Sequence, residues 1–179
     1  MKTSSRPLFL AVFVASLALP LVLSSGGCCV GTARAEQEIK RLGGTVDWTY
    51  WMPWDPYSAV YLQNSPQEID DADLAGVIDS IKTIGPSFLV LNGQKGITDA
   101  SIPLLQQVRS IDTLWLAGTG VTAAGVRSLK GMPKLTEIGV GAPTFTEEDV
   151  AALQREMPKV EIVRMKWDGG WLRPTKRAD

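Results

Sequence analysis

Leu114-Trp115-Leu116-Ala117-Gly118-Thr119-Gly120-Val121-Thr122-Ala123-Ala124-Gly125-Val126-Arg127-Ser128-Leu129 is the stretch of sequence that decides the fold. Leu114 and Leu116 alternate with polar or outward-facing positions, as in a strand with one buried face. Val121, Val126 and Leu129 follow at helical spacing, and Thr122 can accept hydrogen bonds from the first N–H groups of a helix. The stretch therefore predicts a strand, a turn and a helix. Their shared apolar edge is buried only when further units stack on it.

The same pattern occurs three more times, in gapless segments that begin at Ile69, Ile97 and Phe145. Each segment has apolar residues at its first, sixth and ninth places. Each has a residue suited to a helix N-cap at its second place, and these residues are Asp70, Thr98, Thr122 and Thr146. A short apolar-x-apolar strand precedes each segment, and a fifth, Val163-Arg164-Met165, follows the last. The equivalent strand positions are therefore predicted to be Leu62, Leu91, Leu116, Val140 and Met165.

The spacing of these positions and the motifs between them resemble a known family, the bacterial leucine-rich repeats of the form L-x-L-x-G-T-x-V-T-D-A-G-L-x-x-L. The resemblance runs from about Glu36 to Met165 and includes the opening helix Glu38–Gly44, which is similar to an I-x-x-L-G-G lead-in. Ala123 stands where the family has Asp, and Gly139 where a larger strand residue is common. The resemblance implies an α/β fold: a short right-handed leucine-rich-repeat solenoid with parallel strands on the concave face and helices on the convex face. It also implies a binding role without catalytic residues.

Four regions follow from these patterns. Residues 1–35 are expected to be a signal peptide or lipoprotein leader, and 36–58 an N-terminal helix with an aromatic cap. Residues 59–166 hold about four repeat units and a closing strand. Residues 167–179 are expected to form a C-terminal cap and tail, because the ends of a solenoid need covering.

The leader places two positive residues before an apolar run, Leu8–Leu23, and then small residues, which is the order of a secretory signal. Two exits remain open. Gly26-Gly27-Cys28 resembles a lipobox, which makes Cys28 a lipidation candidate, whereas Ala33-Arg34-Ala35 fits ordinary signal peptidase. A retained, uncleaved anchor is a third possibility. We expect an exported protein of the periplasm or cell envelope, either lipid-anchored at Cys28 or secreted after cleavage at Ala35.

Composition narrows the functional classes. Removing Lys2, Arg6 and Arg34 with the leader lowers the formal charge from −1 to −4, which disfavours nucleic acid as a partner. The chain has no His, and its two Cys residues are both in the leader region. The commonest general base and metal ligand are therefore missing. We expect no enzymatic activity, no cofactor and no metal.

A candidate binding site follows from strand alternation, because residues between the inward-facing ones point outward. The outward column is predicted to read Tyr61, Val90, Trp115, Gly139 and Arg164, with Phe88 in the column before it. Tyr61, Phe88, Val90 and Trp115 would form an exposed patch that binds another protein, and Arg164 would make the last strand basic. Two alternatives remain: a structural envelope protein, or carbohydrate binding through Trp and Tyr. The aromatic segments 48–57 and 167–171 could instead cover the patch.

Overall fold

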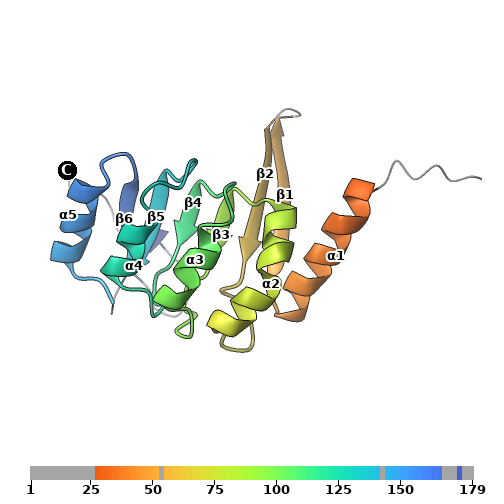
Figure 1. Ribbon diagram of the computed structural model, residues 1–179, viewed down its shortest axis with the longest axis horizontal. Helices are drawn as coiled ribbons and strands as arrows, with labels where there is room; N and C mark the ends of the chain where they lie inside the picture. The colour runs from red at the N-terminus through yellow and green to blue at the C-terminus, as the bar shows by residue number, and fades with distance from the viewer. Residues whose placement is uncertain (1–26, 53–54, 142–143, 167–172, 175–179) are drawn as a thin grey trace, which may run out of the picture.

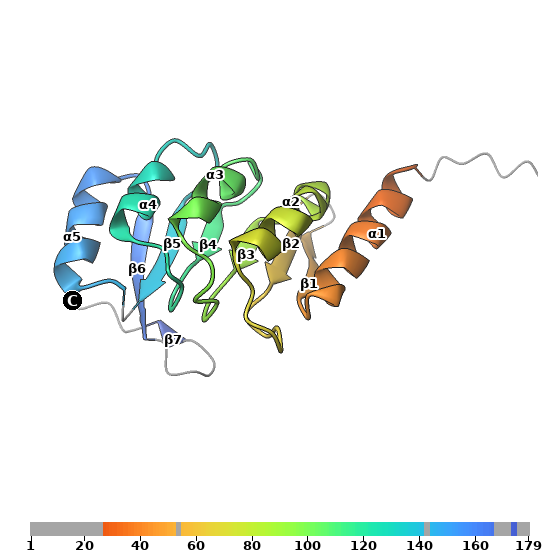
Figure 2. The same cartoon turned by 60° about the horizontal axis from the view of Figure 1, so that its bottom comes forward.

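The protein folds as an α/β structure in which helices pack on one face of a mostly parallel sheet (Figures 1 and 2). The computed structural model describes residues 27–52, 55–141, 144–166 and 173–174. The helices are α1 (Gly27–Arg41), α2 (Asp71–Ile84), α3 (Ile102–Leu105), α4 (Ala123–Ser128) and α5 (Glu147–Glu156), with a 3₁₀ turn, η1 (Asp99–Ser101), before α3. The strands are β1 (Thr45–Met52), β2 (Asp55–Tyr61), β3 (Phe88–Val90), β4 (Thr113–Trp115), β5 (Glu137–Gly141), β6 (Glu161–Lys166) and β7 (Arg173–Pro174).

The strands follow one another across the sheet in sequence order, from β1 to β7. β2 to β6 are parallel, whereas β1 and β7 are antiparallel additions at the two edges. Tyr61 pairs with Val90, Val90 with Trp115, and Trp115 with Gly139. The predicted alignment of β2, β3, β4 and β5 is therefore confirmed.

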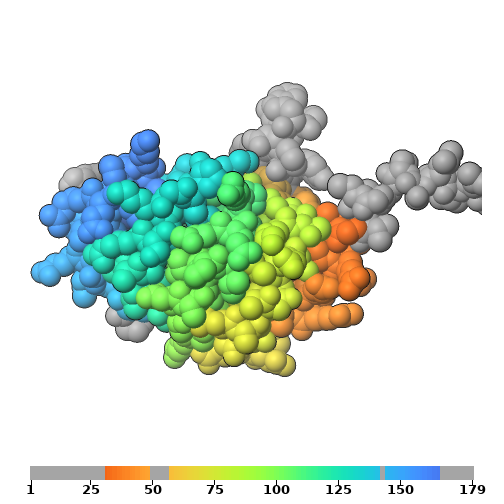
Figure 3. Space-filling model, in the orientation of Figure 1, coloured from red at the N-terminus to blue at the C-terminus, as the bar shows by residue number. Residues whose placement is uncertain are grey.

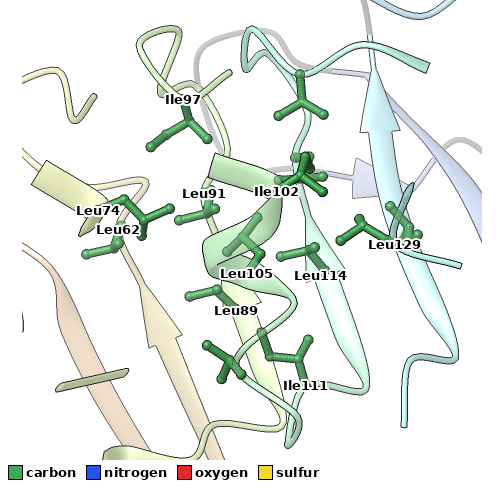
Figure 4. Close-up of a cluster of buried hydrophobic side chains, with 14 of the residues drawn as sticks. Leu62, Leu74, Leu89, Leu91, Ile97, Ile102, Leu105, Ile111, Leu114 and Leu129 are labelled. Carbon is green, nitrogen blue, oxygen red and sulfur yellow. The ribbon is translucent and has the colours of Figure 1, made fainter. Parts of the chain in front are cut away.

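The main core lies between the sheet and the helices. Leu89 and Leu114, at the centres of β3 and β4, are fully buried and face Ile102 and Leu105 of α3 (Figure 4). Leu74 of α2 and Leu129 after α4 extend the same core along the sheet. Seen from outside, the helices form a continuous surface from α1 to α5 (Figure 3). The periodic Leu and Ile residues are thus framework residues, as their spacing predicts.

All four predicted N-cap residues are confirmed. Asp70 Oδ1 accepts hydrogen bonds from the N–H groups of Ala72 and Asp73 at 2.9 and 2.8 Å. Thr98, Thr122 and Thr146 accept equivalent bonds at the starts of η1, α4 and α5. These oxygens satisfy N–H groups that have no partner within the helix. At the other end of α2, Gly85 adopts φ 64°, the left-handed conformation that ends helices, directly before Pro86.

Two aspartates, Asp71 and Asp99, each link one unit to the next. The Asp71 carboxylate accepts from the Thr98 N–H at 2.9 Å and from the hydroxyls of Thr98 and Ser101. One unit later, Asp99 accepts from the Thr122 N–H at 2.8 Å and the Thr122 hydroxyl at 2.6 Å. A Cβ on Gly125 would lie 2.1 Å from Asp99 Oδ1, so only Gly leaves room there. The third link is missing because Ala123 occupies the aligned position.

These aspartate links predict that substitutions at positions 123 and 149 have non-additive effects on stability. Asp149 aligns with Ser101 and Gly125, and its Oδ2 already accepts from the Thr146 N–H at 3.0 Å. Ala123→Asp alone would place two carboxylates together and is expected to destabilise the fold. Combined with Asp149→Ser it would reproduce the Asp71–Ser101 pair. We expect a coupling free energy of about 0.5–3 kcal/mol in a double-mutant cycle measured by urea unfolding. Purely additive effects would show that no such link forms.

The N-terminal region differs from its prediction in two ways. Helix α1 begins at Gly27, not at Glu38, and so crosses the expected boundary between residues 35 and 36. Ala35 and Ile39 lie one turn apart and both are buried in the core. At its other end α1 stops at Arg41, before Gly43 and Gly44. Gly43 has φ 78°, a conformation that suits glycine and does not continue a helix.

Most of the segment expected to form an aromatic cap is a β-hairpin at the edge of the sheet. β1 and β2 pair along their length, from Thr45↔Tyr61 to Met52↔Asp55, so an antiparallel strand extends the edge of the sheet. The apolar part of the leader and most of the predicted C-terminal cap lie outside the described residues. Within the described residues, no helix is long and apolar enough to cross a membrane.

Candidate functional site

The candidate site is the sheet face opposite the helices, which we call the aromatic face. Three strands supply it: Tyr57, Ala59 and Tyr61 from β2, Phe88 and Val90 from β3, and Trp115 from β4. They lie side by side because Ala59 pairs with Phe88 and Tyr61 with Val90, and Val90 in turn with Trp115. Alternate strand residues point to the same face, which separates this set from Val60, Leu89 and Leu114 in the main core.

The rings pack edge to face. The Phe88 ring lies 4.6 Å from the Trp115 ring and 5.9 Å from the Tyr61 ring, centroid to centroid, with interplanar angles of 86° and 82°. Tyr57 contacts Phe88 from the other end of β2, at 6.4 Å. T-shaped pairs bring the positive ring edge of one residue to the negative face of another. Phe88 is therefore the centre of the cluster.

The predicted juxtaposition of Tyr61, Phe88, Val90 and Trp115 is confirmed, but their predicted exposure is only partly right. Phe88 is 9% exposed and Val90 is 0% exposed. Tyr57, Tyr61 and Trp115 are half-buried and pack against them. Phe88 and Val90 thus form a floor, and the three half-buried rings are the groups that can contact a ligand. Sequence reasoning missed Tyr57, although it belongs to the same alternation as Ala59 and Tyr61.

The predicted position of Arg164 is wrong. Gly139 pairs with Val163, the residue before the predicted one, and Arg164 pairs with Val140. A slip of one residue reverses the face of every side chain. Arg164 therefore points toward the helices, where it forms an ion pair with Glu147 at the start of α5. The side chain of Lys166, the other basic residue of β6, lies outside the described residues.

Val163 takes the place that was expected for Arg164, and the side chain of Met165, which pairs with Gly141, lies over Gly139. A Cβ on Gly139 would lie 2.6 Å from the Met165 Sδ and 2.8 Å from the Trp115 Cδ1. The missing side chain at Gly139 therefore makes room for Trp115 and for Met165, which is 2% exposed. This accounts for Gly139, the small residue in a strand where a larger one is common.

A hydrogen bond fixes the Trp115 indole on this face. Its Nε1 donates to Glu137 Oε1 at 3.0 Å. Glu137 begins β5 and pairs with Thr113, which precedes Trp115 in the same alternation, so the carboxylate lies on the same face as the ring. Turning the ring would break this bond and leave a half-buried N–H without a partner, which costs free energy. The bond therefore restricts the orientation of Trp115.

Burial and nearby charges raise the pKa values of the two described tyrosines. Burial, together with the neighbouring Tyr61, Asp112 and Glu137, raises the pKa of Tyr57 to about 12. Burial and the charge of Asp47 raise the pKa of Tyr61. Both phenols therefore stay neutral at physiological pH. Among the described residues, Asp47, Asp112 and Glu137 place carboxylates near the two rings.

We expect Tyr57 to be the last of these groups to ionise in an alkaline titration followed by tyrosinate absorbance. Its contribution to stability is complete below pH 10, the ordinary tyrosine value, where both states are neutral. It falls between pH 10 and about 12, because the unfolded chain then loses a proton that the folded chain retains. Tyr57→Phe should remove the highest transition from the titration curve. A curve that retains it would show that Tyr57 is not the shifted group.

The helix side offers little chemistry by comparison. A shallow hollow there is lined mainly by Gln106, Arg109, Lys130 and Met132, at the ends of α3 and α4. The acidic clusters at the starts of α2 and α5 cap their own helices. No group of side chains suited to hold a metal ion occurs in the part of the chain that the structure describes.

The chain has no recognisable relative in two comparisons with known proteins: no protein-family model matches it, and no curated protein matches it.

Proposed function

We propose that the chain is a short leucine-rich-repeat solenoid, right-handed, with the sheet on its concave face and the helices on its convex face. Three observations support this architecture. Strands β2 to β6 pair in parallel and in sequence order. Paired positions such as Tyr61, Val90, Trp115 and Gly139 recur at the spacing of such repeats, roughly 20–29 residues. Asp71 and Asp99 make equivalent hydrogen bonds to the following unit, at the place where the repeat motif has Asp.

On this scaffold we propose a non-catalytic binding module, which contacts another protein through the aromatic face. The observation that carries the proposal is the half-buried trio Tyr57, Tyr61 and Trp115, held on a buried floor of Ala59, Phe88 and Val90. Tyr and Trp dominate the energetics of protein interfaces, because they bury a large area at a low cost in side-chain entropy. A floor that is already packed keeps the rings in place before a partner arrives, which reduces the cost of binding.

The proposal places the protein outside the cytoplasm, as its leader predicts, either anchored at Cys28 or released after Ala35. The structure of α1 supports the first exit. Ala35 is 3% exposed in the core, and α1 packs against α2. Cleavage after Ala35 would remove Gly27 to Ala35 from α1, whereas cleavage directly before Cys28 would keep almost the whole helix. Mass spectrometry of the mature protein should find an acylated Cys28 at its N-terminus. A free Glu36 would contradict this choice.

The binding role is tested by comparing variants in capture from an envelope extract. Tyr61→Ala/Trp115→Ala should lose the protein that the immobilised wild-type chain retains, because it removes two of the three contacting rings. Met132→Ala/Val150→Ala is the matched control, since it trims two half-buried apolar side chains on the helix side. Melting curves confirm that each variant is folded. Unchanged capture by the ring variant would overturn the proposal.

A further inference from the structure

Three carboxylates border the aromatic face and are without basic partners among the described residues. Asp47 on β1 pairs with Ala59 and acts on Tyr61. Asp112, directly before β4, and Glu137 lie close enough to Tyr57 to raise its pKa. None of the three forms an ion pair with a Lys or Arg in the described part of the chain. The ion pairs found there, such as Arg164–Glu147 and Arg127–Glu156, lie on the helix side.

Among the residues whose side chains the structure describes, the face also lacks positive charge of its own. Strands β1 to β5 contain no Lys or Arg. Arg164 on β6 points to the helices, as its contact with Glu147 shows. The described part of the aromatic face thus combines ring faces with carboxylates that form no ion pair with a described basic side chain. A ligand with the opposite charge would be attracted, and an acidic one repelled.

We propose that the aromatic face binds a segment of the partner protein that is rich in Arg or Lys. The proposal rests on the binding function assigned above and names the chemistry of its partner. Cations are attracted to the faces of Trp and Tyr rings, and the apolar stems of Arg and Lys pack against the same rings. Glu137 Oε1 holds the Trp115 indole, while its Oε2 accepts no hydrogen bond among the described residues. A guanidinium lying on Trp115 could donate to that second oxygen.

Ring faces and a carboxylate are both available on one part of the aromatic face, near Tyr57, Trp115 and Glu137. Tyr57 and Trp115 both contact Phe88, at 6.4 and 4.6 Å between centroids, and Glu137 acts on both of them. Basic side chains of a bound segment can therefore meet ring faces and a carboxylate in the same region of the aromatic face. Asp47 beside Tyr61 provides a second such place, on the neighbouring edge of the sheet. Two places on one face suit a peptide with several basic residues better than a single small cation.

The test is fluorescence anisotropy of labelled peptides titrated with the folded full chain. The probes are an alternating Arg-Gly peptide and Gln-Gly and Glu-Gly peptides of the same length. We expect the Arg-Gly peptide alone to bind, and its affinity to fall as salt is added. Trp115→Ala should weaken binding about tenfold. Glu137→Gln retains an oxygen acceptor for the Trp115 indole, and it should also weaken binding of the Arg-Gly peptide. Glu148→Gln is the control, an exposed acid on α5, and should change nothing.

Equal affinity for the Arg-Gly and Gln-Gly peptides would overturn the cationic proposal, as would an unchanged affinity in Glu137→Gln. Self-association of the chain that is lost in Tyr61→Ala/Trp115→Ala would also overturn it, because the occupant would then be a second copy. The two proposals can fail separately. If capture from the extract requires Tyr61 and Trp115 but not Glu137, the binding face stands and its basic partner does not. If capture requires none of them, both proposals fall.

Discussion

We expect Leu116→Ala to lower the free energy of unfolding by about 2–5 kcal/mol. Leu116 follows β4, and its side chain is 1% exposed within the main core. Its N–H donates to the carbonyl of Gly139 at 2.7 Å, so the backbone around it is fixed by the neighbouring strand. The structure therefore cannot easily collapse into the space that the lost carbon atoms would leave. The shift of the urea unfolding midpoint measures the effect.

Leu104→Ala is the matched control for this prediction. It is the same substitution in α3, but Leu104 is half-buried at the edge of the same core. Less apolar surface is lost and water can fill part of the space, so the decrease in stability should be clearly smaller. Equal losses for the two variants would show that Leu116 is not buried as described.

The second large effect is expected for Gln94→Leu, which should cost roughly 2–6 kcal/mol because two backbone groups lose their partners. Gln94 is 4% exposed. Its Oε1 accepts from the Ile69 N–H at 2.7 Å, and its Nε2 donates to the Leu62 carbonyl at 2.9 Å. Leu is close to Gln in size, so the cost comes from the two buried polar groups and not from a cavity.

Gln107→Leu serves as the control for Gln94→Leu. The Gln107 amide also donates to a backbone carbonyl, that of Pro103 at 3.4 Å, but the side chain is exposed to water. Water replaces the lost partner there, and the change in stability should stay within about 0.5 kcal/mol. If Gln94→Leu were equally mild, the bridge between Leu62 and Ile69 would not be structural.

The repeat framework could be predicted from the sequence because the same apolar spacing and the same kind of capping residue recur in each unit. The positions of Leu89, Leu91, Leu114 and Leu116 follow from strand alternation, and all four are buried. The helix starts follow from the capping residues Asp70, Thr98, Thr122 and Thr146, which act locally and so leave a local signal. Gln94 left no such signal. It lies in a glycine-rich turn, and its two partners, Ile69 and Leu62, belong to the preceding unit.

The register of β6 could not be predicted because two alignments satisfy the same pattern. Val163-Arg164-Met165 has the apolar-x-apolar form of the other strands, but Ile162 is also apolar and can face the core one residue earlier. Tertiary contacts decide between them. Glu147 lies on the helix side and accepts Arg164, while Gly139 leaves space for Met165 on the aromatic face. Both partners are distant in sequence, so the strand alone does not reveal its register.

Only part of the candidate site could be predicted, because the burial of its side chains depends on tertiary contacts. Strand alternation brings Tyr61, Phe88, Val90 and Trp115 to one face, but it does not say which of them the others cover. The large rings of Tyr61 and Trp115 flank Val90 in the neighbouring strands, so Val90 is buried between them. The hairpin was missed because residues 48–57 read as an isolated aromatic segment. Once β1 and β2 pair, Tyr57 joins the site.

Site-specific photo-crosslinking tests most directly whether the aromatic face is the binding surface. A photoreactive residue at Thr113, which lies on that face between Phe88 and Glu137, is compared with one at the exposed Ala124 on α4. In cells that produce the protein natively, we expect position 113 to give a discrete adduct with another protein, which disappears when Tyr61 and Trp115 are replaced by Ala. Position 124 should give none. An adduct at position 124 and none at position 113 would contradict the account.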